Sequence, residues 1–130
     1  MPRESMAALQ PLVVIVEDDA AMLKALGRVL RARGFDTAPY ASAEDLLASP
    51  PRRAPVCMLF DIQLGRMSGR ELHGTLKSRG SQVPVIMMTA FDDEHYRREA
   101  QAQGCAGYFN KVQDIDALFE LIAFLQAAEK

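Results

Sequence analysis

Five side chains that could together hold a divalent cation and a phosphoryl group stand at or directly after apolar stretches of the chain. They are Glu17, Asp18, Asp61, Thr89 and Lys111. Three carboxylates in one small site repel one another, and sharing a hard cation such as Mg²⁺ keeps all of them ionised. The hydroxyl and the ammonium would then supply the hydrogen bonds and the charge that a phosphoryl group needs. This chemistry requires that the five residues lie together.

The apolar stretches themselves predict strands. Residues 12–16, 56–64 and 83–88 are nearly continuous apolar runs without a helical period, which is typical of parallel strands buried on both faces. Residues 106–109 form a shorter run. Residues 35–41 contain Pro39, which a sheet tolerates mainly in an edge strand. We therefore expect five strands.

Helix signals separate these strands. The predicted helix N-caps are Asp19, Ser42, Ser68, Asp92 or Asp93, and Asp114. Strand and helix thus alternate five times, which predicts an α/β fold with a parallel sheet and helices on both of its faces. Because parallel strands share one carboxyl edge, all five candidate residues are expected at that edge, where α/β proteins usually bind ligands.

Composition excludes several classes of protein. The chain of 130 residues is long enough for one domain, and its hydrophobic (49%) and charged (25%) fractions are ordinary for a globular protein. A net charge of −2 gives no reason to expect direct binding of nucleic acid or of a membrane surface. Cys57 and Cys105 are predicted to be buried thiols and not a disulfide. Residues 1–10 are expected to be a flexible leader to a domain at 11–130.

Short motifs make the sequence resemble a known family. They are residues 14–19 (VIVEDD), 59–64 (LFDIQL), 67–69 (MSG), 85–90 (VIMMTA) and 107–111 (GYFNK). In this order and at these separations, the chain resembles the receiver domain of bacterial two-component response regulators from Leu12 to about Ala128. The resemblance implies a doubly wound, flavodoxin-like sheet of strand order 2-1-3-4-5 with five helices. It also implies a cytoplasmic signalling domain that is not an enzyme.

The resemblance assigns roles to the candidate residues. Asp61 would be the phosphoacceptor, taking a phosphoryl group from the phosphohistidine of a sensor histidine kinase or of a histidine phosphotransfer protein. The implied Mg²⁺ ligands are Asp18, Asp61, the backbone carbonyl of Gln63 and, directly or through water, Glu17. Thr89 and Lys111 would bind phosphoryl oxygens, and Tyr108 would turn inward when Thr89 moves toward the phosphate.

Three positions depart from the usual pattern of that family. Val112 stands where a proline usually follows the lysine, so the bond there is expected to be trans and the loop differently placed. Gly65-Arg66 replaces Pro-Gly, which predicts a more mobile loop after the phosphoacceptor. Gln63 and Phe91 flank the line along which water would attack the phosphoryl group. Our hypothesis is that Phe91 shields this line and prolongs the phosphorylated state.

Two other functions stay open. A phosphohydrolase that also forms an aspartyl phosphate would need an acid two residues after its nucleophile, and that position is Gln63. An interaction module of the same shape that works without phosphorylation would be expected to lose an acid, the threonine or the lysine of the site. This chain keeps all of them.

Plain structural roles compete for single residues. Thr89 also fits a hydroxyl at a strand end, and Lys111 a solvated charge. An aromatic side chain such as Tyr108 in an outer strand is often only half-buried packing. His73 and His95 are expected on helix surfaces, away from the acidic edge.

The last helix suggests an interaction surface. Leu121 and Phe124 widen its apolar stripe beyond one face, which indicates a homodimer or an output partner near the last strand and helix, or else additional core burial. The chain is expected to be either a single-domain regulator or the receiver part of a longer one with an output domain.

Overall fold

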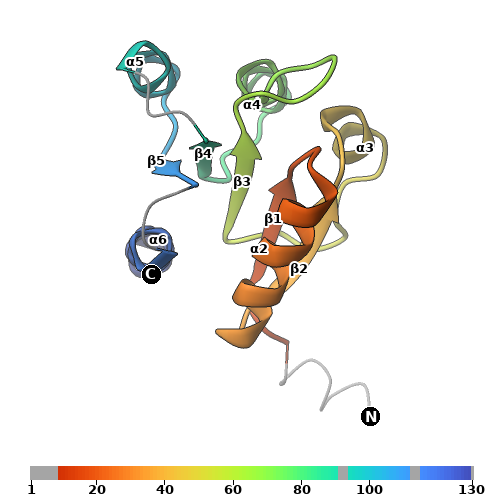
Figure 1. The fold of residues 1–130 in the computed structure, drawn as a ribbon, viewed down its shortest axis with the longest axis vertical. Helices are drawn as coiled ribbons and strands as arrows, with labels where there is room; N and C mark the ends of the chain where they lie inside the picture. The colour runs from red at the N-terminus through yellow and green to blue at the C-terminus, as the bar shows by residue number, and fades with distance from the viewer. Residues whose placement is uncertain (1–8, 91–93, 112–114, 130) are drawn as a thin grey trace.

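The computed structural model describes residues 9–90, 94–111 and 115–129. Residues 1–8 of the leader expected at 1–10, and the expected caps at Asp92, Asp93 and Asp114, therefore lie outside the described residues. Within them, strands and helices alternate (Figure 1). The strands are β1 (Leu12–Val16), β2 (Asp36–Tyr40), β3 (Cys57–Asp61), β4 (Val85–Thr89) and β5 (Gly107–Asn110). The helices are α2 (Ala20–Ala32), α3 (Ala43–Ala48), α4 (Gly69–Ser78), α5 (Glu94–Gln103) and α6 (Ile115–Glu129). The strands are parallel in the order β2-β1-β3-β4-β5, which confirms the expected fold.

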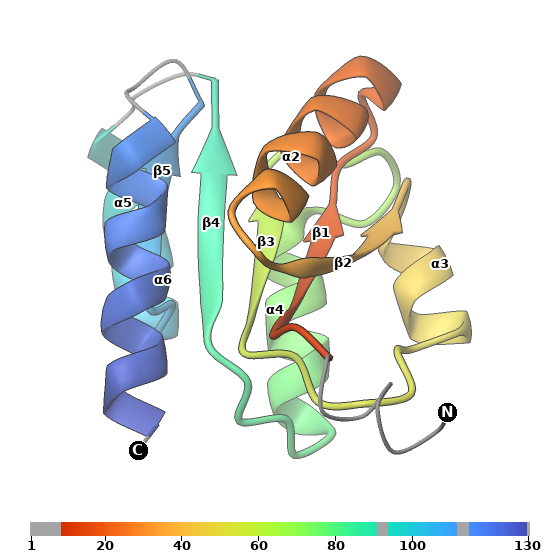
Figure 2. The same ribbon diagram turned by 90° about the horizontal axis from the view of Figure 1, so that it is seen from below.

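Helices cover both faces of the sheet (Figure 2). On one face α2 and α6 pack against alternate strand residues, and on the other α3, α4 and α5 pack against the remaining ones. Every residue of β1, β3 and β4 is buried. Burial on two faces is the physical reason why these strands are apolar at successive positions and do not alternate.

The remaining sequence expectations for the fold are largely met. Asp19 and Ser42 each accept a hydrogen bond from the backbone N–H three residues on. Ser68 and Glu71 form a reciprocal capping box, with hydrogen bonds of 3.1 and 2.9 Å. The two cysteines form no disulfide with each other, as expected; Cys57 is buried, whereas Cys105 is only half-buried. Among the described helices, none has the length and apolar character needed to cross a membrane.

One expectation about α4 is wrong. His73 was expected on a helix surface, but it is only 4% exposed, and its buried Nδ1 has no hydrogen-bond partner among the described residues. The reason is helical spacing: His73 follows Gly69 by four residues and precedes Leu76 by three, so it lies on the stripe that faces the sheet. His95 is exposed, as expected.

Stability should therefore depend on pH through His73. Burial, and then the nearby charge of Lys77, lowers the pKa of His73 below its ordinary value of 6.5. The unfolded chain then takes up a proton near pH 6.5 while the folded protein does not, so this contribution to stability is lost as the pH falls below 6.5. The free energy of unfolding is measured with urea at pH 7.5 and at pH 5.5. Its decrease from the higher to the lower pH should be larger in the parent protein than in His73→Leu. An identical pH dependence in the parent protein and in His73→Leu would contradict the assignment.

A tight backbone contact joins α4 to the end of β3. The backbone N–H of Gly69 donates to the carbonyl of Ile62 at 3.0 Å, and a Cβ at position 69 would collide with the carbonyl oxygen of Asp61. Only a glycine therefore lets the helix begin this close to the strand.

We expect Gly69→Ala to destabilise the protein by roughly 1 to 3 kcal/mol, because the backbone must shift to admit the methyl group. Gly65→Ala is the matched control: within the described part of the chain, nothing beyond its two chain neighbours lies within 4 Å of a Cβ at that position. Chemical denaturation should show the loss for the first variant and no comparable loss for the second. Equal stability of the two variants would contradict the close contact.

Candidate functional site

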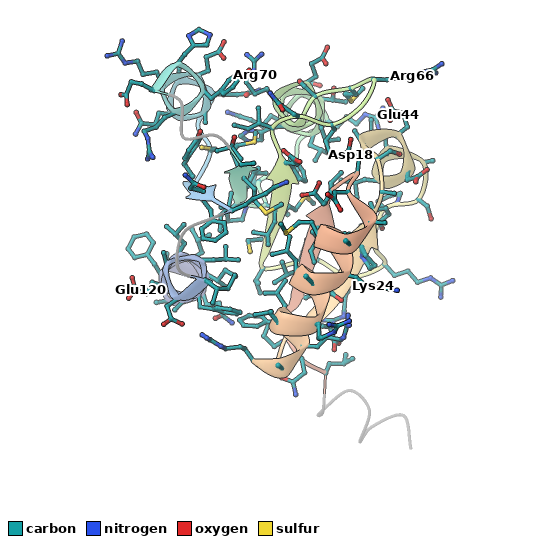
Figure 3. The ribbon with its side chains drawn as sticks, in the orientation of Figure 1. Asp18, Lys24, Glu44, Arg66, Arg70 and Glu120 are labelled. Carbon is teal, nitrogen blue, oxygen red and sulfur yellow. The ribbon has the colours of Figure 1, made fainter. Side chains whose placement is uncertain are left out.

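The carboxyl edge of the sheet brings the predicted residues together. Asp61 is the last residue of β3 and Thr89 the last of β4, while Glu17 and Asp18 follow β1 and Lys111 follows β5. A cleft of about 450 Å³ opens at this edge. Its lining residues are Glu17, Asp18, Asp19, Asp61, Gln63, Leu64, Gly65, Ala90 and Lys111. Figure 3 shows Asp18 at this edge, with Arg66 pointing away from the body of the molecule.

Four of the lining residues were not predicted as site residues: Asp19, Leu64, Gly65 and Ala90. Asp19 and Ala90 each directly follow a predicted site residue, and the other two belong to the loop after β3. Adjacency to the strand ends was thus the signal that could have found them. Thr89 itself lies deeper, only 3% exposed.

Lys111 links two carboxylates of the cleft. Its Nζ lies 2.8 Å from Oδ2 of Asp61 and 2.5 Å from Oε1 of Glu17, and the side chains of all three residues are at most 10% exposed. Burial works against the ammonium, but the carboxylates of Asp61 and Glu17 outweigh it and raise the pKa of Lys111 above its ordinary value. The lysine is therefore charged at neutral pH and holds its two partners in place.

Glu17 is the most deeply buried acid of the site, at 1% exposure. Its burial raises the pKa of its carboxyl group from 4.5 to about 7, and the neighbouring Asp61 adds to the rise. The hydrogen bonds from Lys111 and from the backbone N–H of Asp19 act in the opposite direction and lower the pKa, but they do not outweigh the burial. Ionising this carboxyl group is therefore costly without a further positive charge.

A divalent cation fits this arrangement. Glu17, Asp18 and Asp61 offer ligand oxygens that all lie within 4.8 Å of one another. Carboxylate oxygens are ligands that Mg²⁺ prefers, and two of these acids are buried while Asp18 is exposed, so the site is open on one side. The second oxygen of Asp61, Oδ1, accepts a hydrogen bond of 3.0 Å from the backbone N–H of Gln63. Each carboxylate oxygen of Asp61 is thus held by a hydrogen bond from the protein, Oδ1 by Gln63 and Oδ2 by Lys111.

The residues expected to act in switching lie at different depths. The carbonyl of Thr89 accepts a 2.7 Å hydrogen bond from the backbone N–H of Lys111, which joins the ends of β4 and β5. Tyr108 is half-buried on β5, away from the lining of the cleft, with the guanidinium of Arg97 4.5 Å from the centre of its ring. Phe91 and Val112 lie outside the described residues. Gln63 is exposed at the mouth of the cleft.

Comparison with known proteins decides the family. The family model of the response regulator receiver domain matches residues 13–123. The chain belongs to this family. Among curated relatives, the response regulator protein FleR of Pseudomonas aeruginosa is 34% identical over 111 residues, which is 85% of this chain and 24% of that protein. The response regulator protein TodT of Pseudomonas putida is 30% identical over 76% of this receiver chain and 44% of that protein. The receiver chain therefore spans less than half the length of these relatives.

Solved receiver structures agree with the fold. The receiver chain matches the structure of FixJ-N with a TM-score of 0.82 and 27% identity, covering 90% of this chain and 94% of the other. It matches the response regulator StyR with a TM-score of 0.81 and 27% identity, covering 91% and 60%. The receiver domain of the Francisella response regulator 1452 has a TM-score of 0.84 at 22% identity, covering 92% and 99%, and shows the same fold.

Lys111 should stabilise this receiver most at alkaline pH. Without its ammonium, Glu17 and Asp61 would face each other as buried like charges, so Lys111→Met should lower the free energy of unfolding by roughly 2 kcal/mol at pH 8. The loss should shrink at pH 5, because protonation of Glu17 then removes one of the charges. Urea unfolding at both pH values measures the difference, with exposed Lys24→Met as the matched control. A loss of the same size at both pH values would contradict this account.

Proposed function

We propose that this receiver accepts a phosphoryl group on Asp61 in a Mg²⁺-dependent reaction. The observation that carries the proposal is the placement of one nearly buried carboxylate between Lys111, 2.8 Å away, and a cluster of acids with cation-binding geometry. Membership of the response regulator receiver family supports the same chemistry. The donor would be a phosphohistidine on a sensor histidine kinase or a histidine phosphotransfer protein, so the chain would act in a cytoplasmic phosphorelay.

The transfer is a displacement at phosphorus. An oxygen of Asp61 attacks, the bond between phosphorus and the imidazole nitrogen of the donor breaks, and its electron pair stays on that nitrogen. The Asp61 carboxylate becomes an aspartyl phosphate. Bound Mg²⁺ would neutralise part of the negative charge on the acids and on the phosphoryl oxygens. Asp18, Asp61, Glu17 and the carbonyl of Gln63 would hold it.

The remaining residues respond to the new charge. Lys111 already lies at Asp61 and would bind one phosphoryl oxygen, and the Thr89 hydroxyl would bind another. A movement of Thr89 would vacate space toward β5 for the Tyr108 ring, which changes the surface near that strand. Gln63, and Phe91 outside the described residues, would set how long the phosphoryl group lasts.

The receiver of this proposal needs a partner to pass the signal on. Phe124 of α6 is 70% exposed, although it is a large apolar side chain. An exposed aromatic residue on α6 fits contact with an output partner or with a second copy of the chain. The curated relatives FleR and TodT are longer proteins in which such contacts could be sought.

Incubation with acetyl phosphate and Mg²⁺, followed by intact-mass measurement, tests the phosphoacceptor directly. We expect one phosphoryl adduct that disappears in Asp61→Asn and in a sample treated with a chelator. Asp45→Asn, an exposed acid on α3, is the matched control and should still take up the phosphoryl group.

Other results would favour the competing functions. If no adduct forms and calorimetric titration detects no Mg²⁺ binding, the phosphorylation-independent module is the better explanation. Continuous release of inorganic phosphate from an excess of acyl phosphate, at many turnovers per minute, would instead support a phosphohydrolase.

A further inference from the structure

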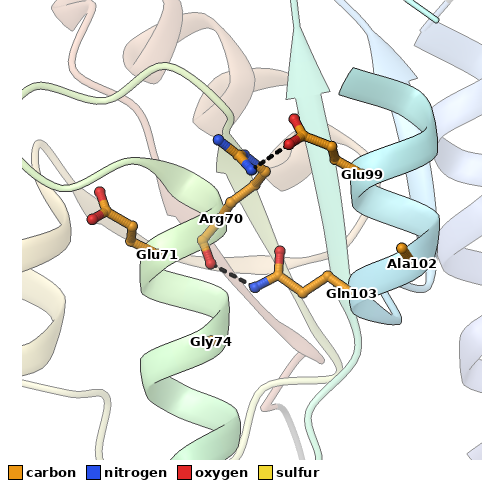
Figure 4. Close-up of a pocket in the computed structure, with 6 residues that line it drawn as sticks. All are labelled: Arg70, Glu71, Gly74, Glu99, Ala102 and Gln103. Atoms are coloured by element: carbon orange, nitrogen blue, oxygen red, sulfur yellow. Dashed lines mark hydrogen bonds and ion pairs between the residues drawn. The ribbon is translucent and has the colours of Figure 1, made fainter. Parts of the chain in front are cut away.

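Helix α5 is attached to α4 mainly by polar contacts. Among its residues only Ala100 is buried, so apolar packing contributes little to holding it. Instead, Arg70 donates to a carboxylate oxygen of Glu99 at 2.8 Å, and the side-chain amide of Gln103 donates to the carbonyl of Arg70 at 2.7 Å (Figure 4). Lys77 donates to the carbonyl of Gln103 at 2.6 Å. These contacts fix the rotation of α5 about its own axis.

The same face of α5 reaches the mouth of the phosphorylation site. Tyr96 precedes Glu99 by three residues and Gln103 by seven, so all three lie on the stripe that faces α4. The ring of Tyr96 packs against the buried cluster on this face of the sheet. Its hydroxyl oxygen accepts a hydrogen bond of 3.4 Å from Nε2 of Gln63. The polar contacts between α4 and α5 therefore hold the residue that Gln63 contacts.

Gln63 is in turn bound to the phosphoacceptor. Its backbone N–H donates to Oδ1 of Asp61, and its side chain lines the cleft. Nε2 carries two N–H groups, one of which donates to Tyr96, and the amide oxygen Oε1 is the acceptor that this side chain can offer to water in the cleft. A fixed acceptor beside the phosphoryl group can orient an attacking water molecule.

We infer that Tyr96 is a positioning residue that acts through Gln63 to speed loss of the phosphoryl group from Asp61. This inference rests on the proposed function. In the reaction, the water oxygen bonds to phosphorus and the bond between phosphorus and the Asp61 oxygen breaks with its electron pair left on the carboxylate. Both protons of the water end on the inorganic phosphate. Tyr96 touches neither reactant and serves only to hold the Gln63 amide in one orientation.

Tyr96→Phe removes the hydroxyl and keeps the ring that packs on the core. The loss of one neutral hydrogen bond should slow dephosphorylation roughly 2- to 10-fold. If Tyr96 acts through Gln63, the same substitution made in a Gln63→Ala background should change the rate by less than about 1.5-fold. The measurement is the half-life of the phosphorylated protein after removal of acetyl phosphate, followed by intact mass. Tyr40→Phe is the matched control, since its hydroxyl donates to the carbonyl of Ser49 and lies outside the cleft lining.

A second measurement reads the contact without phosphorylation. The side-chain amide signals of Gln63, assigned in a ¹⁵N spectrum by their loss in Gln63→Ala, should shift in Tyr96→Phe and stay in place in Tyr40→Phe. Unshifted signals, an unchanged or faster rate in Tyr96→Phe, or an equal effect in both backgrounds would overturn the inference. If the parent protein takes up no phosphoryl group, the proposed function fails, whereas the spectrum still reports on the contact itself.

Discussion

A single ammonium group between two buried carboxylates is the interaction on which this site depends. Lys111 leaves β5, which is separated from β3 by β4, so its side chain must cross the end of β4 to reach Asp61. The backbone N–H of the lysine is anchored on the carbonyl of Thr89 for this purpose. Without the lysine or a cation, keeping Glu17 buried as an anion would be more costly still, because desolvation raises its pKa to about 7 even with Lys111 in place. Charge balance at one sheet edge thus constrains three separate strands.

The backbone around Asp61 shows how closely the fold and the site are joined. The strand ends at this residue, its side chain accepts the N–H of Gln63, and its carbonyl lies against Gly69 at the start of α4. The capping box formed by Ser68 and Glu71 fixes the same helix start. Asp61 is consequently held in place by the packing of strand β3 against helix α4.

The sequence allowed prediction of the fold and of the site acids, because alternating strands and helices place all strand ends at one edge. Other features depend on how each helix is rotated, and apolar spacing reports rotation poorly where polar residues share the inward face. For this reason the burial of His73 was not predicted. The contacts of Tyr96 with Gln63 and of Arg70 with Glu99 join segments that are distant in sequence. They could not be predicted, because the presence of opposite charges on two helices does not tell which acidic and basic residues form pairs. Tyr108 was placed correctly on β5. Its proposed role as a switch would depend on a second state of the domain.

Pro39 in strand β2 has a consequence for how molecules behave at high concentration. The backbone N–H of Asp36 donates to the carbonyl of Pro11, and the carbonyl of Tyr40 accepts from the backbone N–H of Glu17. The backbone groups of residues 36, 38 and 40 therefore face β1. Those of residues 37 and 39 face outward, along the free edge of the sheet. Proline has no N–H, so only one of the two outward-facing residues of this strand can donate a backbone hydrogen bond. A strand from another molecule would find an interrupted ladder there, which protects the open edge from intermolecular sheet extension and aggregation.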